Sequence, residues 1–126
     1  MNISTAREVH WTLAPSIDWC VEQAWVLALD SQLKVLEFHL VSKGTVSFCP
    51  IHPRDIFRFV ISRNATQFIL AHNHPSENEM PSPEDIAFTK KIVKLALLHE
   101  IPFLDHVILT KTKATSLRAL KLIRHW

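Results

Sequence analysis

The segment FILAHNHPSENEMPSPEDIAFTKKIV, residues 68–93, decides the fold because it joins a strand, a polar loop and the start of a helix. Residues 68–71 are a short apolar run of the kind that forms a central strand. Ser82 suits the N-cap of a helix, and Pro83 suits its first position. We therefore expect a strand that runs directly into His72, and a helix that begins after Ser82.

The rest of the chain adds strands and helices on both sides. The expected strands are residues 24–29, 33–41, 103–110 and 116–123. One helix is expected between Ser4 and Pro15, and a second is expected to begin at Pro53 and to stop at Asn64. The helix after Ser82 should end before Pro102 and turn toward the core Ile86, Val93, Ala96 and Leu97. The order helix, two strands, helix, strand, helix, strands predicts an α/β sandwich with a mixed sheet between helices.

Length and composition fit one domain. The chain has 126 residues, 48% of them apolar, which is enough for a core without disulfides or metals. We expect a single domain over residues 1–126, with residues 1–20 as a short helical extension and no separate DNA-binding domain. The net charge of +2 is too small to indicate a polyanionic partner by itself. Because Gly44 is the single glycine, turns with positive φ are expected at Asn or Asp.

Cysteine usage and the N-terminus favour a cytoplasmic protein. Cys20 and Cys49 are the two cysteines, and we expect both to be reduced and buried. The first ten residues are polar and do not resemble a secretion signal. No apolar run approaches the roughly 18 residues of a membrane span, so no membrane partner is expected.

The two histidines suggest a metal site. His72 and His74 are two residues apart, and on an extended backbone such residues point to the same side. Zinc accepts imidazole nitrogen and carboxylate oxygen, and Asp85, in the first turn of the following helix, is the third candidate ligand. Each part has a simpler interpretation, because the histidines could hydrogen-bond in a loop while Ser82 and Asp85 cap a helix. The whole combination, placed between a strand and a helix, is more specific than its parts.

The run HNHPS at residues 72–76, with the later Ser82 and Asp85, resembles the signature of the MPN/JAMM metalloprotease domain family. The similarity is greatest to its RadC-like bacterial branch. Other blocks resemble that branch too: EQAWVLALD at 22–30, KGT at 43–45, HPRDIF at 52–57, RNATQFILAHNHPS at 63–76 and FLDHVIL at 103–109. The resemblance covers about residues 22–123. It implies an MPN-type, cytidine-deaminase-like fold, in which a mixed sheet is sandwiched between helices.

The resemblance also implies a chemistry. One zinc ion would be held by His72, His74 and Asp85, with a zinc-bound water as nucleophile. Glu22 would take the proton of that water and pass it to the leaving amine, and Ser82 would help to stabilise the oxyanion. The implied activity is hydrolysis of a peptide or isopeptide bond in a peptide or protein substrate.

Other polar pairs offer rival candidates. Glu37 and His39 also place a carboxylate and an imidazole on one strand face, although we expect them on the solvent side of an outer strand. Asp105 and His106 could orient a metal ligand, but a satisfied pair at a strand end is the favoured interpretation. The remaining histidines show no partner pattern: His10, His52, His99 and His125.

The chain departs from the family pattern at Glu77, where RadC-like relatives usually have glycine. A carboxylate there would lie close to the metal and could fill its open position. This departure keeps a second hypothesis open, a non-catalytic MPN binding module. A third is a DNA-repair-associated accessory protein, which the resemblance implies because the RadC-like branch carries a DNA-repair label. The residues after Asp105 are consistent with it, since they include several basic side chains and no acidic one. A homodimer is a further possibility, since Trp126 is expected to be the most exposed tryptophan.

Overall fold

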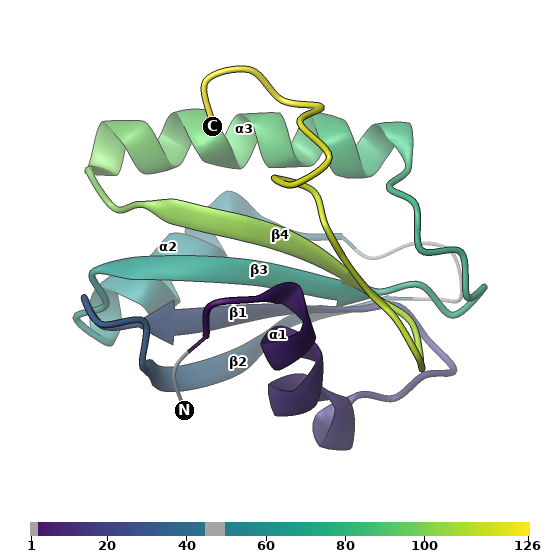
Figure 1. Cartoon of the computed structure of the whole chain (residues 1–126). Helices are drawn as coiled ribbons and strands as arrows, with labels where there is room; N and C mark the ends of the chain where they lie inside the picture. Colours follow the sequence, from purple (N-terminus) through teal and green to yellow (C-terminus); the bar gives the residue numbers. More distant parts are fainter. Residues whose placement is uncertain (1–2, 45–49) are drawn as a thin grey trace.

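A mixed five-stranded sheet in the order β2-β1-β3-β4-β5 forms the centre of the protein (Figure 1). The computed structural model describes residues 3–44 and 50–126, so Thr45 and Cys49 of the sequence predictions lie outside the described residues. The strands β3 and β4 are parallel, and all other neighbours are antiparallel. The bounds are β1 (Gln23–Leu29), β2 (Val35–Lys43), β3 (Gln67–Asn73), β4 (Phe103–Leu109) and β5 (Ala114–Ser116).

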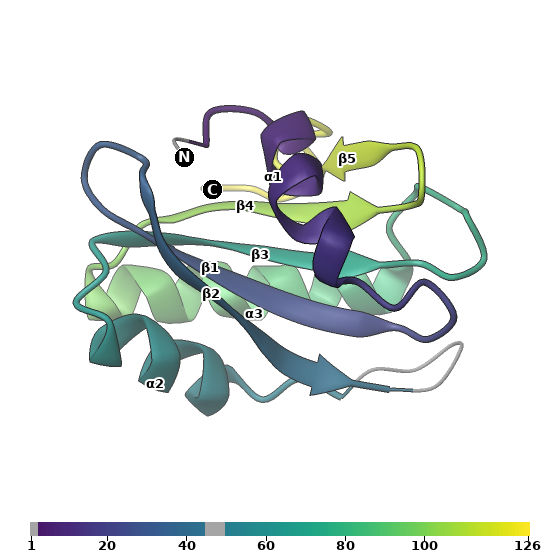
Figure 2. The ribbon, with the colours of Figure 1, turned by 90° about the horizontal axis from the view of Figure 1, so that it is seen from below.

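Helices cover both faces of this sheet (Figures 1 and 2). The helix α1 (Ala6–Leu13), extended by a short 3-10 helix (Ala14–Ser16), packs on one face, while α2 (Pro53–Ser62) and α3 (Pro83–His99) cover the other. The connection through α3 is needed because two parallel strands cannot be joined by a tight turn. The predicted single α/β domain, with a mixed sheet between helices, is confirmed.

The central strand β1 explains why its sequence reads as one apolar run. All seven of its residues are buried. Trp25, Leu27 and Leu29 pack in the cluster that contains α1, whereas Val26 and Ala28 pack in the cluster that contains α2 and α3. A strand covered on both faces has no polar side to alternate with. The run AWVLAL therefore predicted this strand to within one residue.

The predicted last strand, residues 116–123, is wrong in most of its length. β5 ends at Ser116, and the chain then turns, with the Leu120 amide donating to the Ser116 carbonyl. Leu117 is the one buried residue of 117–123. A strand over this stretch would expose nearly all its side chains and would find no further partner at the edge of the sheet.

Two predicted element starts are displaced. Thr5, not Ser4, caps α1, because its hydroxyl accepts a hydrogen bond from the Glu8 amide. The strand β2 begins at Val35, two residues later than predicted, because Leu33 adopts φ 66° in the turn after β1.

The expectation that positive φ would be limited to Asn and Asp is also wrong. Asn64, which follows α2, does adopt φ 52° as predicted. Five other non-glycine residues share this conformation: Leu33, Glu77, Glu100, Lys121 and His125. Each costs on the order of 1 kcal/mol relative to glycine. With a single glycine in the chain, turns of this kind are made by other residues.

Three predictions of burial need correction. Leu97 is 66% exposed because the C-terminal end of α3 turns it away from the sheet. Cys20 is exposed in the segment before β1. Trp11 is the most exposed tryptophan at 59%, while Trp126 is half-buried and donates its indole N–H to the Phe103 carbonyl. Among the described residues, no helix has the length and apolar character needed to cross a bilayer.

Candidate metal site

The two histidines stand at the carboxyl end of β3. His72 lies within the strand, paired with Ala24 of β1, and His74 follows one residue after the strand ends. Their Nε2 atoms are 2.9 Å apart, and the ring centroids are 4.7 Å apart. The i, i+2 spacing therefore brings both imidazoles to one side of the strand, as predicted.

Asp85 approaches the same point from the first turn of α3. Its Oδ1 lies 3.2 Å from His72 Nε2, and its Oδ2 lies 3.2 Å from His74 Nε2. The carboxylate also accepts the Ser82 amide at 2.8 Å, while the Ser82 hydroxyl accepts the Asp85 amide at 3.1 Å. This reciprocal capping box fixes the orientation of Asp85 before any ligand is considered.

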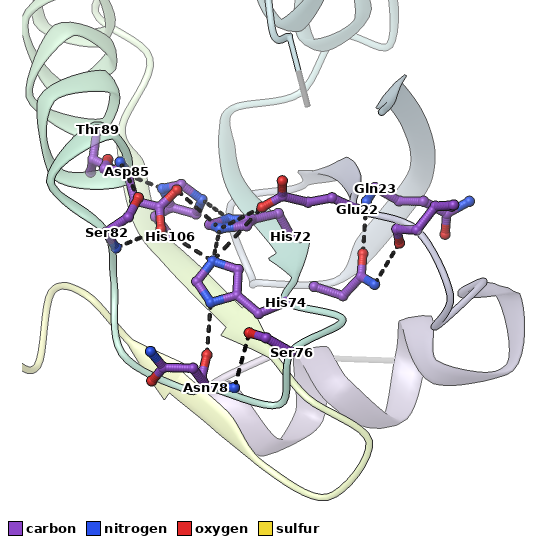
Figure 3. Close-up of polar contacts among 12 residues, drawn as sticks. Glu22, Gln23, His72, His74, Ser76, Asn78, Ser82, Asp85, Thr89 and His106 are labelled. Carbon is purple, nitrogen blue, oxygen red and sulfur yellow. Dashed lines mark hydrogen bonds and ion pairs between the residues drawn. The ribbon is translucent and has the colours of Figure 1, made fainter. Parts of the chain in front are cut away.

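Glu22 completes the group from the residue that precedes β1. Its Oε1 lies 4.0 Å from His72 Nε2 and 3.8 Å from His74 Nε2. One ligand atom from each of Glu22, His72 and His74 lies within 4.8 Å of the others, so this group could bind a metal ion. Four side chains from three parts of the chain point toward one another in Figure 3: His72, His74, Asp85 and Glu22.

The donor atoms fit a metal ion that prefers nitrogen and oxygen. His74 Nδ1 lies 2.7 Å from the Asn78 carbonyl oxygen, which can accept but not donate a proton. The neutral ring therefore keeps its proton on Nδ1 and turns an unprotonated Nε2 toward His72 and Asp85. Two imidazoles and a carboxylate form a donor set of the type found at catalytic zinc centres.

Asn73, between the two histidines, holds the backbone around Glu22. It is fully buried, and its Oδ1 accepts the Gln23 amide at 2.8 Å. Its side-chain amide donates to the Val21 carbonyl at 2.9 Å. The peptide groups on both sides of Glu22 are thereby tied to β3. Asn73 had no role among the sequence predictions, because it follows the expected strand 68–71 in the polar segment, whereas β3 continues to Asn73. Its place between the two histidines was the available signal.

Burial and neighbouring charges shift the pKa values of Glu22, His74 and Asp85. Burial raises the pKa of Glu22, and the two histidines offset this effect in part. Burial also acts on Asp85, but the adjoining imidazoles of His72 and His74 hold the pKa of this carboxyl well below its usual range. For His74, burial opposes protonation, yet the Asp85 carboxylate and the Asn78 carbonyl, which both accept from the protonated ring, raise its pKa above the usual value. Asp85 therefore stays a carboxylate, which is the form that binds a cation.

A buried polar chain lies behind His72. His72 Nδ1 is 2.7 Å from His106 Nε2 in β4, and His106 Nδ1 is 2.6 Å from Thr89 Oγ1 in α3. Burial and the neighbouring His72 lower the pKa of His106 well below its usual value, so this imidazole is neutral. The favoured interpretation of an Asp105–His106 side-chain pair is wrong, because the Asp105 carboxylate accepts the backbone amide of His106 instead.

Comparison with known proteins identifies the family. A model of the RadC-like JAB domain matches residues 3–122. The chain belongs to the RadC-like JAB domain family. This confirms the resemblance to the RadC-like branch that the sequence analysis drew from the histidine segment.

The relatives of this JAB domain are UPF0758 proteins. It is 43% identical over 109 residues to one from Thermosynechococcus vestitus, covering 86% of this chain and 44% of the relative. It is 41% identical over 119 residues to one from Synechocystis sp., covering 94% and 49%. A third, from Desulforudis audaxviator, is 40% identical over 97 residues, covering 77% and 42%. The chain thus spans less than half the length of these relatives.

The structure of this JAB domain shows how Glu77 fits at a position where relatives usually have glycine. Glu77 adopts φ 64°, the conformation that glycine takes most easily. Its carboxylate accepts the Lys111 amide at 3.2 Å and does not line the cleft around the histidines. The expectation that this charge would lie against the metal is therefore not met in the structure.

The rival carboxylate lies elsewhere in this JAB domain. Glu37 is exposed on β2, an edge strand, and forms an ion pair with Arg63. His39 is exposed and stacks on Phe59, with centroids 5.0 Å apart. The expected placement of Glu37 and His39 on an outer strand is confirmed.

A cleft of about 1080 Å³ opens over the histidines of the JAB domain. Glu22, Ser82 and Asp85 line it together with both histidines. Apolar side chains form much of the remaining wall: Pro50, Ile51, Met80, Pro81, Pro83 and Phe88. The cleft is large enough to admit a segment of extended polypeptide beside the candidate metal site.

Proposed function

We propose that the protein is a zinc-dependent hydrolase that cleaves peptide or isopeptide bonds in a polypeptide substrate. The supporting observation is the convergence of two imidazoles and two carboxylates in one open cleft. Imidazole nitrogen with carboxylate oxygen is a donor set that zinc accepts, and catalytic zinc sites combine three such ligands with an open position. The RadC-like JAB family match supports the same class of domain.

In this proposal, His72, His74 and Asp85 hold the zinc ion. Asp85 is favoured over Glu22 as the third ligand because its oxygens lie 3.2 Å from the imidazole nitrogens, whereas Glu22 lies 4.0 and 3.8 Å away. When bound, zinc lowers the pKa of a coordinated water toward neutrality and polarises the scissile carbonyl.

Glu22 then acts as the general base and acid. Burial raises the pKa of its carboxyl group, which favours a group that must both take up and release a proton near neutral pH. Glu22 accepts a proton from the attacking water and delivers it to the leaving amine.

Ser82 acts on the carbonyl oxygen. Its Oγ accepts the Asp85 amide, and that bond does not use the hydroxyl proton. The proton can be donated to the oxygen on which negative charge develops.

The test combines metal content with turnover in four proteins: the wild type, Glu22→Gln, His72→Ala and Asp85→Ala. We expect zinc in the wild type and in Glu22→Gln, and little in the other two. Hydrolysis, measured on a panel of peptide-linked and isopeptide-linked substrates, should be present in the wild type alone. Loss of zinc from Glu22→Gln with retention in Asp85→Ala would exchange the roles of the two carboxylates.

The same experiment separates the rival functions. A wild type that binds zinc but hydrolyses no substrate would favour a non-catalytic binding module. Two of the basic side chains after Asp105 already have partners within the chain, since Lys113 pairs with Glu79 at 3.5 Å and Arg118 donates to the Leu104 carbonyl. Salt-dependent binding to DNA would nevertheless support the accessory-protein alternative.

A further inference from the structure

We propose that Thr89 and His106 are positioning residues that fix the tautomer of His72 and so present its unprotonated Nε2 to the cleft. This inference deepens the proposed function, because it concerns one ligand of the same site. It assigns a role to two buried side chains whose effect on the site passes through His72.

The contacts form an unbroken line from α3 to the cleft. Thr89 Oγ1 lies 2.6 Å from the Asp85 carbonyl oxygen and 2.6 Å from His106 Nδ1. His106 Nε2 lies 2.7 Å from His72 Nδ1. None of these three residues is more than 3% exposed, so water does not compete for their hydrogen bonds. Figure 3 shows Thr89 and His106 behind His72, on the side away from His74.

The Asp85 carbonyl oxygen, at the α3 end of this line of contacts, sets the direction in which the protons point. The Asp85 carbonyl oxygen can only accept, so the hydroxyl proton of Thr89 must point to it. Thr89 Oγ1 then accepts from His106, which must carry its proton on Nδ1. His106 Nε2 is left as an acceptor and takes the Nδ1 proton of His72. His72 Nε2 is therefore the nitrogen without a proton.

The opposite direction breaks the hydrogen bond at the Thr89 end of this line. If Thr89 donated to His106, the Thr89 and Asp85 oxygens would face each other at 2.6 Å with no proton between them. In a buried site, the loss of such a hydrogen bond costs about 1–3 kcal/mol. In the proposed direction, one hydroxyl group sets the protonation pattern of two imidazoles, and the unprotonated His72 Nε2 faces the Asp85 carboxylate at 3.2 Å, two acceptors that a bound cation would bridge.

His74 reaches the same state by a separate route. Its Nδ1 faces the Asn78 carbonyl, which can only accept, at 2.7 Å. Both ligand candidates thus turn a lone pair toward the cleft, one through a backbone carbonyl and one through the Thr89–His106 pair.

The first test reads the tautomers directly. Nitrogen NMR of metal-free protein, labelled at histidine and held at alkaline pH, distinguishes protonated Nδ1 from protonated Nε2. We expect His72 to be protonated at Nδ1 in the wild type and in Thr89→Ser, which keeps the hydroxyl. Thr89→Val keeps the shape and removes the hydroxyl, so it should shift His72 toward protonation at Nε2. A wild type protonated at His72 Nε2 would overturn the proposal.

The second test measures zinc affinity by competition with a chelator. Loss of an outer partner of a metal ligand typically lowers affinity about 10–100-fold, and we expect a fall in this range for Thr89→Val. Thr89→Ser is the matched control and should bind within a few-fold of the wild type. Equal affinity in all three proteins would also overturn the proposal. If the wild type binds no zinc, the proposed function fails, while the tautomer measurement still decides this inference.

Discussion

The two histidines of the site lie two residues apart but are supported in different ways. His72 is 3% exposed and is backed by buried side chains from β4 and α3. His74 lies beyond the strand and is oriented by the backbone carbonyl of Asn78 in an exposed loop. Side-chain support can be removed by a point substitution, whereas backbone support survives almost any substitution. The half of the site around His72 should therefore be the more sensitive to mutation.

Asp85 is where the two halves meet, and its loss should have the largest effect. Asp85→Ala removes the carboxylate that contacts both imidazoles, so zinc affinity should fall more than about 100-fold, beyond the range for outer partners. It also removes one side of the capping box, which should lower the free energy of unfolding by about 1 kcal/mol. Chelator competition and chemical denaturation of the metal-free protein measure the two effects. Glu84→Ala, one residue earlier and exposed, is the control and should leave both nearly unchanged.

Two asparagines differ in the same way: Asn73 lies in the strand of His72, and Asn78 lies in the loop of His74. Asn73→Ala removes buried hydrogen bonds to the Gln23 amide and the Val21 carbonyl, so the free energy of unfolding should fall by about 1–3 kcal/mol. Asn78→Ala keeps the carbonyl that faces His74 but loses the exposed hydrogen bond that its side chain accepts from the Met80 amide, so the free energy of unfolding should fall by less than about 1 kcal/mol. Denaturant titration of both variants provides the measurement. Equal losses would mean that the loop depends on its side chains as much as the strand does.

The smallest effect is expected at Glu77, in the loop of His74. Glu77→Gly relieves a positive φ, worth about 1 kcal/mol, but loses the hydrogen bond from the Lys111 amide, worth about as much. The free energy of unfolding should change by less than about 1 kcal/mol, and zinc affinity should not change. Glu77→Ala keeps the strained backbone and loses the bond, so it should be less stable than Glu77→Gly. A rise in zinc affinity or hydrolysis in Glu77→Gly would show that the carboxylate reaches the metal.

Local rules explain which parts of the site were predictable from sequence. The i, i+2 spacing placed His72 and His74 on one side, and the S-P-E-D run predicted the cap that orients Asp85. Each of these depends on residues close together in the chain. Glu22 lies 50 residues before His72, so its approach to the histidines followed from the family resemblance and not from any local pattern.

Thr89 was missed, and His106 was assigned to a pair with Asp105 in preference to a role behind a metal ligand, because the contacts of both residues depend on tertiary packing. His106 reaches His72 through the parallel pairing of β4 with β3, and Thr89 reaches His106 through the packing of α3 on the sheet. No short-range pattern distinguishes a threonine that contacts a histidine from one that contacts leucine. The same limitation explains Leu97, whose helical spacing suggested burial although that end of α3 leaves it exposed.

The capping box has an evolutionary consequence. Ser82 and Asp85 begin α3 by their reciprocal hydrogen bonds, whatever else they do. Selection for a stable helix alone would retain both residues in a descendant that no longer catalyses any reaction. The described side-chain contacts of Glu22 are limited to the two histidines, so the fold gives little reason to keep it. Among the descendants of such a domain, the persistence of Glu22 should therefore track function more closely than the persistence of the serine and the aspartate.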